Sequence, residues 1–507
     1  MSAAQTPEEI ADLVSGYIAE NPTAVVVEDG KMLFDFSTAH YSAAPERDRC
    51  LLQIWSEESN MVRRAISAEV KNGILKLSVL RFGQPKPSRM EICSQAERQS
   101  PSALKAMRAA YQRTLERAVA RLFPGWRLER LTSSADLEHS FGAVCTRGLL
   151  RRGQERIALV GCGHGESQST IDNSVAVAVL WLDYCRQHLA ADSHTGALAL
   201  VLPEGCTRTA QLRLSHLNRL AAQWRLFSLD EHTEQAEELD LATELNLSTR
   251  LVQCTNREQT LERFAKSIAR MATLCPRVEA VAHSSSAVSF RFHGLEFARA
   301  TVEPDRHFRL GERIVFGAAP AEYEWNNDTE PLLVKLVERL LLKRVGRDHT
   351  HPFYRLQPER WLQSVIERDI TLLDAGLDPT LLYSQVPAFA ASDRAVIDLL
   401  GITRDGRIAV IELKATEDFH LPVQGLDYWA RVRWHHRRGD FQLFGYFPGR
   451  ILSERDPILI LAAPALHVHP STATMLRYFS PELEWKLLAL DERWRDGIRV
   501  VFRRQKE

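Results

Sequence analysis

An internal repeat is the feature that most constrains how this chain can fold. Pro203 precedes Trp224 by 21 residues, and Pro464 precedes Trp485 by the same 21 residues. The tripeptide Leu-Asp-Glu begins five residues after each tryptophan, and ERIALVGCGHGE matches GRIAVIELKATE at an offset of 251 residues. Ordered matches at nearly constant spacing are typical of a duplicated structural unit. We therefore expect two copies of one arrangement of strands and helices, one in each half of the chain.

The order of the predicted elements divides the chain into four domains. Its 507 residues are too many for a single hydrophobic core. Strand-like runs with Asp-Gly and Asn-Gly turns dominate the first hundred residues, whereas strands alternate with helices in both copies of the repeat. The predicted domains are a mostly β module at 1–100, the first copy at 101–250, a connecting helix and β module at 251–345, and the second copy at 346–507. The expected class is α/β (α+β), with mixed β-sheets flanked by helices.

Composition excludes several classes of protein. Lysine and arginine number 64 against 65 aspartates and glutamates, so any surface for nucleic acid has to be a local patch. The eight cysteines include no Cys-x-x-Cys pair, which argues against a zinc site or a disulfide framework and favours a reducing compartment. The chain has no apolar run long enough to span a membrane and no targeting segment at its start, so we predict a cytoplasmic protein.

The second copy carries the residues that suggest chemistry. ASDRAVIDLLGITRDGRIAVIELKATED is typical of two strands joined by a three-residue turn at 404–406, in which Gly406 suits the left-handed position. With this turn, Asp398 lies directly opposite Glu412 on the neighbouring strand. Side chains alternate along a strand, so Glu412 and Lys414 share a face. Two carboxylates and an ammonium group are therefore expected to converge beside an apolar sheet.

This group of charges predicts a metal site. Two carboxylates this close are costly to bury unless a cation neutralises them. Asp398 and Glu412 offer hard oxygen ligands, and no histidine or cysteine stands in either strand, which favours Mg²⁺ or Mn²⁺ over zinc. Lys414 would then position or deprotonate an attacking water during phosphodiester hydrolysis.

Residues 357–445 resemble the PD-(D/E)xK nuclease superfamily. The matching residues are Asp398, Glu412, Lys414, Gln424 and Tyr428. The last two resemble the Q-x-x-x-Y motif of several exonuclease and structure-specific endonuclease branches. The resemblance implies a restriction-endonuclease-like fold, metal-dependent hydrolysis of DNA, and catalytic roles for all five residues. It also implies metal ligation by Asp398, Glu412 and Leu413.

A helix carboxylate and a basic helix complete the predicted site. The superfamily usually supplies a further glutamate from the preceding helix. We prefer Glu359, which lies on the apolar stripe of PERWLQSVIERDI, with Glu367 as the alternative. Arg431, Arg433 and Arg437 lie on the helix that follows the second strand, and we expect them to contact DNA phosphates. RNA is not excluded as a substrate.

The first copy lacks these carboxylates. The offset of 251 places Gly161, Gly163 and Arg147 on the positions of the catalytic glutamate, lysine and aspartate of the second copy. We therefore expect a degenerate copy, which packs against the catalytic copy as an internal pseudo-dimer or extends its substrate groove. A single active copy would cut one strand per encounter. Association of two chains into a homodimer is also open.

Two other functions remain open on the sequence alone. One is a non-catalytic nucleic-acid-binding protein that keeps the nuclease fold. The other is an S-adenosylmethionine-dependent methyltransferase, because the glycines from Gly161 to Gly165 follow a strand as in a cofactor loop. Such a loop needs an acidic residue at the end of the next strand, and Asp183 lies at about this distance but inside a predicted helix. We favour a nuclease strand that has lost its metal ligands.

Overall fold

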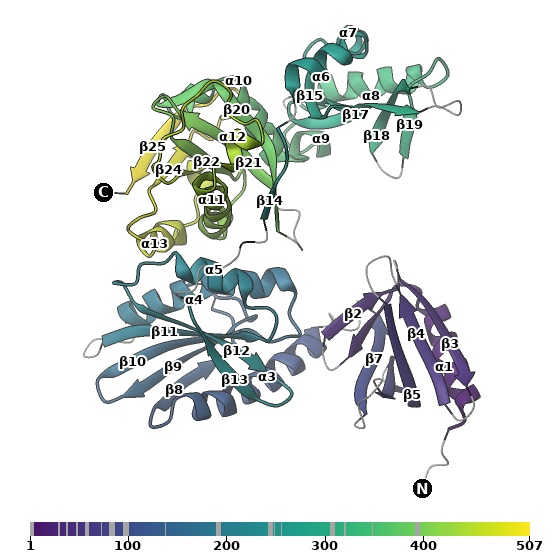
Figure 1. Ribbon diagram of the computed structural model, residues 1–507, viewed down its shortest axis with the longest axis vertical. Coiled ribbons are helices and arrows are strands. Elements are labelled where there is room, and N and C mark those ends of the chain that lie inside the picture. The colour runs from purple at the N-terminus through teal and green to yellow at the C-terminus, as the bar shows by residue number, and fades with distance from the viewer. Residues whose placement is uncertain are drawn as a thin grey trace. The chain divides into compact units, whose positions relative to one another are not determined.

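A computed structural model describes the chain except for residues 1–4, 29–30, 37–38, 47–48, 56–59, 72, 81–86, 95–100, 137, 189–193, 242–246, 248, 255, 305–309, 319–320, 347, 391–395 and 507. It divides into two compact units, of which unit 1 is residues 1–215 with 219–242 and unit 2 is residues 216–218 with 243–507. Each unit contains two β-sheets with helices packed on them (Figure 1). The expected mixture of sheets and helices is thus present. None of the helices in the described ranges is long and apolar enough to cross a lipid bilayer.

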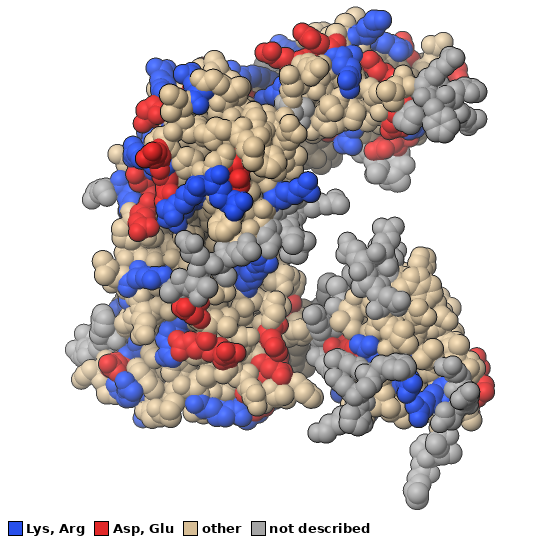
Figure 2. All heavy atoms as spheres, in the orientation of Figure 1, with Lys and Arg blue, Asp and Glu red and all other residues tan. Residues whose placement is uncertain are grey.

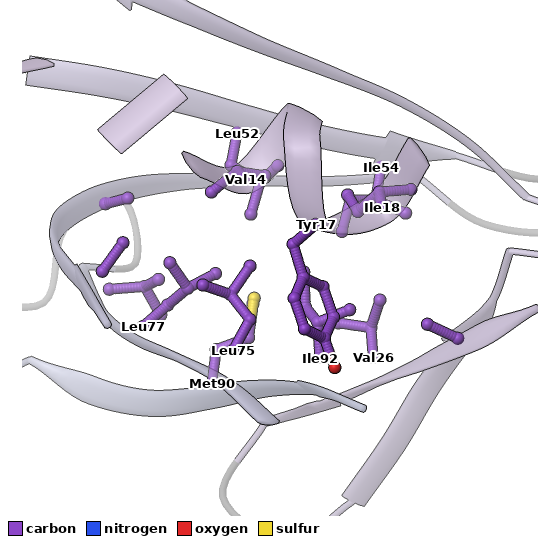
Figure 3. Close-up of a cluster of buried hydrophobic side chains, with 14 of the residues drawn as sticks. Val14, Tyr17, Ile18, Val26, Leu52, Ile54, Leu75, Leu77, Met90 and Ile92 are labelled. Carbon is purple, nitrogen blue, oxygen red and sulfur yellow. The ribbon is translucent and has the colours of Figure 1, made fainter. Parts of the chain in front are cut away.

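The first sheet of unit 1 has seven antiparallel strands in the order β2-β1-β7-β6-β5-β4-β3. The strands are β1 (Ala24–Glu28), β2 (Lys31–Asp35), β3 (His40–Glu46), β4 (Arg49–Trp55), β5 (Asn60–Lys71), β6 (Ile74–Leu80) and β7 (Ser88–Ser94). Helix α1 (Pro7–Glu20) begins with a capping box, in which the side chains of Thr6 and Glu9 each accept the other's backbone N–H. The core between helix and sheet contains Val14, Tyr17, Ile18, Leu52, Ile54, Leu75, Leu77, Met90 and Ile92 (Figure 3).

The second sheet of unit 1 contains the first copy of the repeat and has the order β13-β12-β11-β10-β9-β8. The strands are β8 (Arg127–Thr132), β9 (Thr146–Arg152), β10 (Glu155–Gly161), β11 (His194–Pro203), β12 (Gln223–Asp230) and β13 (Gln235–Leu239). The helices are α3 (Pro101–Leu122), α4 (Gln168–His188) and α5 (Arg208–Ser215). Tyr111 and Leu115 of α3 pack on one face of the sheet. Trp181 of α4 donates its indole N–H to the carbonyl of Gly148 at 2.7 Å.

The first sheet of unit 2 is a five-stranded antiparallel meander. Its strands are β15 (Glu279–Ser284), β16 (Ala287–Phe292), β17 (Leu295–Pro304), β18 (Leu310–Ala318) and β19 (Ala321–Glu324). The helices around it are α6 (Arg257–Arg263), α7 (Ala265–Leu274), α8 (Glu330–Lys343) and α9 (Pro352–Arg355). Phe264, Phe290 and Val337 belong to the core that α7 and α8 share with this sheet.

The last sheet contains the second copy and has the order β14-β20-β21-β22-β23-β24-β25. The strands are β14 (Thr249–Leu251), β20 (Leu377–Ala390), β21 (Val396–Thr403), β22 (Ile408–Leu413), β23 (Ile458–Pro464), β24 (Trp485–Leu490) and β25 (Val500–Gln505). The helices are α10 (Pro358–Arg368), α11 (Leu421–Arg437), α12 (Asp440–Leu443) and α13 (Ser471–Arg477), with short 3₁₀ turns η1 (Ile370–Leu372) and η2 (Ala465–His467). Leu362 of α10 packs with Ile411 and Leu413 on one face, whereas Gly425 of α11 meets Leu461 on the other.

The two α/β sheets correspond strand for strand. From β8 to β13 and from β20 to β25, two antiparallel pairings precede two parallel pairings and a final antiparallel pairing. The parallel register also corresponds, because Pro203 pairs with Leu229 and Pro464 pairs with Leu490. A long helix, α4 or α11, joins the third strand of each series to the fourth. The spacings found in the sequence therefore mark equivalent places in two sheets of one topology.

Candidate active site

The hairpin of β21 and β22 has the register that its turn predicts. Its antiparallel pairs, continued by one residue, place Asp398 opposite Glu412. Gly406 in the turn has a φ of 82°, which is the left-handed conformation expected of it. Asp398 accepts a hydrogen bond from the backbone N–H of Leu413 at 3.0 Å. The hairpin thus holds two carboxylates side by side on neighbouring strands.

Both carboxyl groups are in an environment that disfavours their charge. Glu412 is 3% exposed, and its Oε2 atom has no hydrogen-bond partner within the described part of the chain. Burial, followed by the charge of Asp398, raises the pKa of Glu412 well above its ordinary value. Burial also raises the pKa of Asp398, against the effect of the hydrogen bond from Leu413. A buried carboxylate oxygen without a partner is costly, and a bound cation would satisfy it.

The ammonium group of Lys414 lies among three carboxylates. Its Nζ atom is 3.8 Å from Glu412, 3.7 Å from Glu359 and 3.7 Å from Asp418. Burial disfavours the charged ammonium, but the surrounding carboxylates have the larger combined effect and raise the pKa of Lys414. Sequence reasoning did not include Asp418, although a carboxylate four residues after the lysine was an available signal.

Asp398 and Glu359 border a cleft of about 450 Å³. It is lined by Gln357, Pro358, Glu359, Arg360, Gln363, Gln385, Val396, Asp398 and Tyr428. Gln385 lies opposite Asp398 in the register of β20 and β21, and its φ is 55°. Gln357, which precedes α10, has a φ of 48°. Left-handed backbone is uncommon for residues other than glycine and concentrates at functional sites. No local sequence pattern predicts this conformation for a glutamine.

Of the two candidate helix glutamates, α10 presents Glu359 to the cleft and not Glu367. Glu359 lines the cleft and approaches Lys414. Glu367 accepts a hydrogen bond from Gln363 at 2.6 Å and lines a second cavity along the same helix. Eight residues separate the two glutamates, which places them about 80° apart around the helix axis. The structure therefore brings the preferred glutamate, and not the alternative, to Lys414.

Helix α11 places Tyr428 at the cleft. Pro422 occupies the first turn of the helix, where its missing N–H is tolerated. Tyr428 lines the cleft, and burial together with the charges of Glu412 and Asp398 raises the pKa of its hydroxyl. Gln424 precedes Tyr428 by one turn, and its buried Oε1 atom has no hydrogen-bond partner among the described residues.

The three arginines expected to contact DNA are held in different ways. Arg433 donates to Asp456 at 2.8 Å, and Arg437 donates to the same carboxylate at 3.0 Å. Arg431 is half-buried and forms no ion pair with any described residue. Across the coloured face in Figure 2, positive and negative residues are interspersed rather than gathered in a single large patch. Phosphate contact by Arg433 or Arg437 would therefore have to compete with Asp456.

The residues at the hairpin fit a hard divalent cation with few protein ligands. Among the described residues, no group of three or more His, Cys, Asp or Glu side chains is arranged to hold a metal ion. The site offers instead the opposed carboxylates of Asp398 and Glu412, with an oxygen of Glu412 unsatisfied. Mg²⁺ is usually bound through one or two carboxylates and keeps several waters, so this pair is sufficient. The carbonyl of Leu413 stays the expected third ligand.

The equivalent hairpin of the first copy corrects the alignment expected from the sequence. Arg152 pairs with Glu155 across a two-residue turn, so Val160 rather than Gly161 lies opposite Arg147. Gly161 faces α3, as Leu413 of the second copy faces α10. Residues Val160 and Cys162 therefore occupy the places of Glu412 and Lys414. The glycines do not, because the turn is one residue shorter than the turn at 404–406.

The glycines of the first copy allow a helix to approach the sheet. A Cβ atom on Gly161 would lie 2.6 Å from the hydroxyl of Tyr111 and 2.7 Å from a methyl group of Leu115. A Cβ atom on Gly163 would likewise collide with Tyr111, and one on Gly165 would collide with Met107. Side chains of α3 therefore occupy the space that a cofactor loop would offer to a ligand.

In the first copy, an arginine and two aromatic rings lie where the second copy has Asp398. Arg147 is 2% exposed, and its guanidinium carbon is 4.5 Å from the ring centre of Phe141 and 5.5 Å from that of Trp181. One of its nitrogens donates to the carbonyl of Ser134. This arrangement buries a cation where the second copy buries two carboxylates.

Comparison with known proteins identifies no family for this chain. No family model matches the chain, and no curated protein matches it significantly. Among solved structures, the chain is similar to a complex of EndoMS with double-stranded DNA and to a repair endonuclease from Pyrococcus abyssi, each at 13% identity. The similarity covers 45% of this chain and 95% and 97% of those chains, with a TM-score of 0.15 for both. These similarities are too weak to assign a function to the chain.

Proposed function

We propose that unit 2 is a metal-dependent nuclease that hydrolyses phosphodiester bonds in DNA. The observation that carries the proposal is the meeting of Asp398, Glu412 and Lys414, with Asp398 lining a cleft and an oxygen of Glu412 buried and unsatisfied. Buried, opposed carboxylates reduce stability, and groups perturbed in this way concentrate at functional sites. A lysine and a glutamate on an ordinary exposed strand would have neither the opposed carboxylate nor the cleft.

The residues divide the work of hydrolysis between them. Asp398, Glu412 and the carbonyl of Leu413 would hold Mg²⁺ or Mn²⁺, which when bound lowers the pKa of water and stabilises negative charge on the phosphate. Lys414 would hold the attacking water by a hydrogen bond and place a positive charge near the developing negative charge. Glu359, 3.7 Å from the ammonium group, would orient Lys414.

Helix α11 would supply the contacts to the substrate. Tyr428 lines the cleft, and Gln424 lies one helical turn before it. Both would contact the DNA strand beside the scissile phosphate, as the resemblance to the Q-x-x-x-Y branches implies. Arg431, which has no described carboxylate partner, is the arginine best placed to add a phosphate contact, whereas Arg433 and Arg437 would first have to leave Asp456.

The two α/β sheets would then be products of one duplication, with catalysis confined to the second copy. Their common strand order, their common parallel register and the matched spacings in the sequence support this origin. Arg147 and Val160 give the first copy no carboxylates at the equivalent positions. A chain with one active copy cuts one strand of a duplex at a time.

Supercoiled plasmid DNA tests both parts of the proposal. Incubated with the full chain and Mg²⁺ or Mn²⁺, it should first accumulate as nicked circles, and EDTA should prevent the reaction. Linear plasmid without a nicked intermediate would contradict the single active copy. Binding of DNA without any cleavage, over a panel of single strands, flaps, mismatches and junctions with either metal, would contradict the nuclease and favour a non-catalytic DNA-binding protein.

A further inference from the structure

A second cavity, of about 330 Å³, lies along α10 next to the cleft. Residues of α6, β15, β16 and α10 line it, and Arg360 and Gln363 line both this cavity and the cleft. Its charged residues are Arg257, Arg291, Arg360, Arg368, Glu279 and Glu367. Four arginines and two glutamates give it a net charge of four minus two, or +2.

Arg291 is a buried guanidinium group that donates to no carboxylate within the described residues. It is 7% exposed, its Nε atom donates to the hydroxyl of Ser289 at 3.1 Å, and a terminal nitrogen lies 3.3 Å from Nε2 of His283. Within the described residues it forms no ion pair with a carboxylate. Burial, followed by the charge of Arg360, lowers the pKa of Arg291, although the more distant carboxylates of Glu296, Glu367 and Glu279 act in the opposite direction. A buried cation in this position is costly unless an anion is bound.

Arg360 and Arg257 add positive charge to the cavity, and neither forms an ion pair with a carboxylate among the described residues. The Nη1 atom of Arg360 is buried and has no hydrogen-bond partner among the described residues. Arg257 donates only to neutral groups of β20, the carbonyl of Leu382 and the hydroxyl of Ser384, both at 3.1 Å. These two arginines and Arg291 are therefore available to an anion.

The two glutamates of the cavity are already engaged. Glu279 accepts hydrogen bonds from Arg368 at 2.9 Å and from the backbone N–H of Gly294 at 3.2 Å. Glu367 accepts a hydrogen bond from Gln363 at 2.6 Å. Neither carboxylate forms an ion pair with the remaining three arginines in the part of the chain that is described.

A chain of hydrogen bonds connects the cavity to the catalytic strands. The side chain of Gln363 donates to Glu367 and accepts from Gln385, with both distances 2.6 Å. Gln385 lies opposite Asp398 in the sheet. An anion in the cavity would therefore lie one short relay from the residues proposed to bind metal.

We infer that this cavity binds the terminal phosphate of a DNA strand and so sets the strand end beside the cleft. The inference rests on the proposed nuclease function. A phosphomonoester carries nearly two negative charges at pH 7, which balances the net positive charge of the cavity. A guanidinium group can donate two parallel hydrogen bonds to the phosphate oxygens. Arg291 is too deeply buried for a strand that must continue in both directions, whereas a terminal phosphate can enter end-on.

Binding to end-labelled oligonucleotides tests the inference without cleavage. The full chain carrying Glu412→Gln would be titrated, in the absence of divalent metal, with one single-stranded oligonucleotide bearing a 5′-phosphate, a 3′-phosphate or only hydroxyl ends. We expect one of the two phosphorylated forms to bind about tenfold more tightly than the hydroxyl form. Inorganic phosphate should reduce this difference, and a circular strand of the same sequence should not compete for it. Equal affinity for all three forms would overturn the inference.

Substitution of the arginines assigns the effect to the cavity. In the same background, Arg291→Met and Arg360→Met should each reduce the preference for the phosphorylated end to less than about threefold. Arg360→Met keeps the test decisive if Arg291→Met fails to fold, because the Nη1 atom of Arg360 makes no hydrogen bond that folding would lose. Arg313→Met is the matched control, since Arg313 pairs with Glu303 and Glu324 outside the cavity. A preference that survives both cavity substitutions would refute the assignment.

The binding measurement does not require cleavage, so the two proposals can fail separately. A phosphate preference in a chain that shows no cleavage would support phosphate binding by the cavity and contradict the proposed nuclease activity. Cleavage by the wild-type chain with no phosphate preference would support the nuclease activity and contradict phosphate binding by the cavity.

Discussion

The two α/β sheets of this chain place different residues at the same pair of strand positions. In the second copy, Asp398 faces Glu412 across a hairpin with a three-residue turn. In the first copy, Arg147 faces Val160 across a hairpin whose turn is one residue shorter. The shorter turn leaves the pairing equivalent, because Arg147 opposes Val160 as Asp398 opposes Glu412. The two copies therefore differ here in the residues at these positions and not in the register of their strands.

The two copies also differ in how well the groups at these positions are satisfied and packed. The second copy retains a buried carboxylate oxygen that no described residue satisfies. The first copy has Val160 at the position of Glu412 and, at the position of Asp398, Arg147 packed against Phe141 and Trp181, while α3 packs directly on its glycines. We therefore expect substitutions in the second copy to change cleavage and substitutions in the first copy to change stability.

The largest effect is expected from Glu412→Gln. This change keeps the size of the side chain but removes a charged metal ligand, so cleavage of plasmid DNA should fall about a thousandfold. The matched control is Glu237→Gln on the exposed face of β13, which should leave the rate unchanged. Cleavage by the Glu412→Gln chain at the wild-type rate would contradict a catalytic site in the second copy.

A smaller loss is expected from Lys414→Met, which removes the ammonium group but not the metal ligands. Single-turnover cleavage should slow about a hundredfold. Lys414→Arg should recover part of the rate, because a positive donor is restored. The equivalent change in the first copy, Cys162→Ser, should alter the rate less than about twofold. Equal losses from Lys414→Met and Cys162→Ser would show that both copies contribute to the reaction.

The sequence predicted the second hairpin well because its turn is local. The turn at 404–406 and its glycine were enough to place Asp398 opposite Glu412. The first hairpin was aligned wrongly because matching letters at one offset does not reveal a turn that has lost a residue. Gln385 was missed because its backbone conformation depends on pairing within the sheet, and the cavity at Arg291 because it forms with α10, about 70 residues later in the chain.

Gly161→Ala tests the role given to the glycines of the first copy. The added methyl group would collide with Tyr111 and Leu115, so the free energy of unfolding of unit 1 should fall by about 1–3 kcal/mol. Urea titration of the full chain measures this change, and cleavage at low temperature should be unaffected. Gly142→Ala is the control, because a Cβ atom there would meet no atom within 4 Å. Equal stability of the two variants would refute close packing at Gly161.

The smallest effect is expected at the Leu-Asp-Glu repeat, where the two copies also differ. Glu231 accepts a hydrogen bond from the backbone N–H of His164, and burial raises the pKa of its carboxyl. Glu492 accepts the N–H of Leu466 at 2.7 Å and lies 3.7 Å from His467. A carboxyl whose pKa is raised by folding binds its proton more tightly in the folded state. Its contribution to stability is therefore greatest below about pH 4.3, the ordinary pKa of glutamate, and is lost as the pH rises through the raised value.

Glu231→Gln should consequently make the thermal stability of unit 1 less dependent on pH over that interval, with a smaller change at neutral pH than Gly161→Ala causes. Scanning calorimetry at several pH values measures it. Glu492→Gln provides the comparison from the other copy. The carboxylate of Glu492 is partly exposed and can be hydrated, so its substitution should change stability little. If the two substitutions alter the pH dependence equally, burial of Glu231 is not what distinguishes the two repeats.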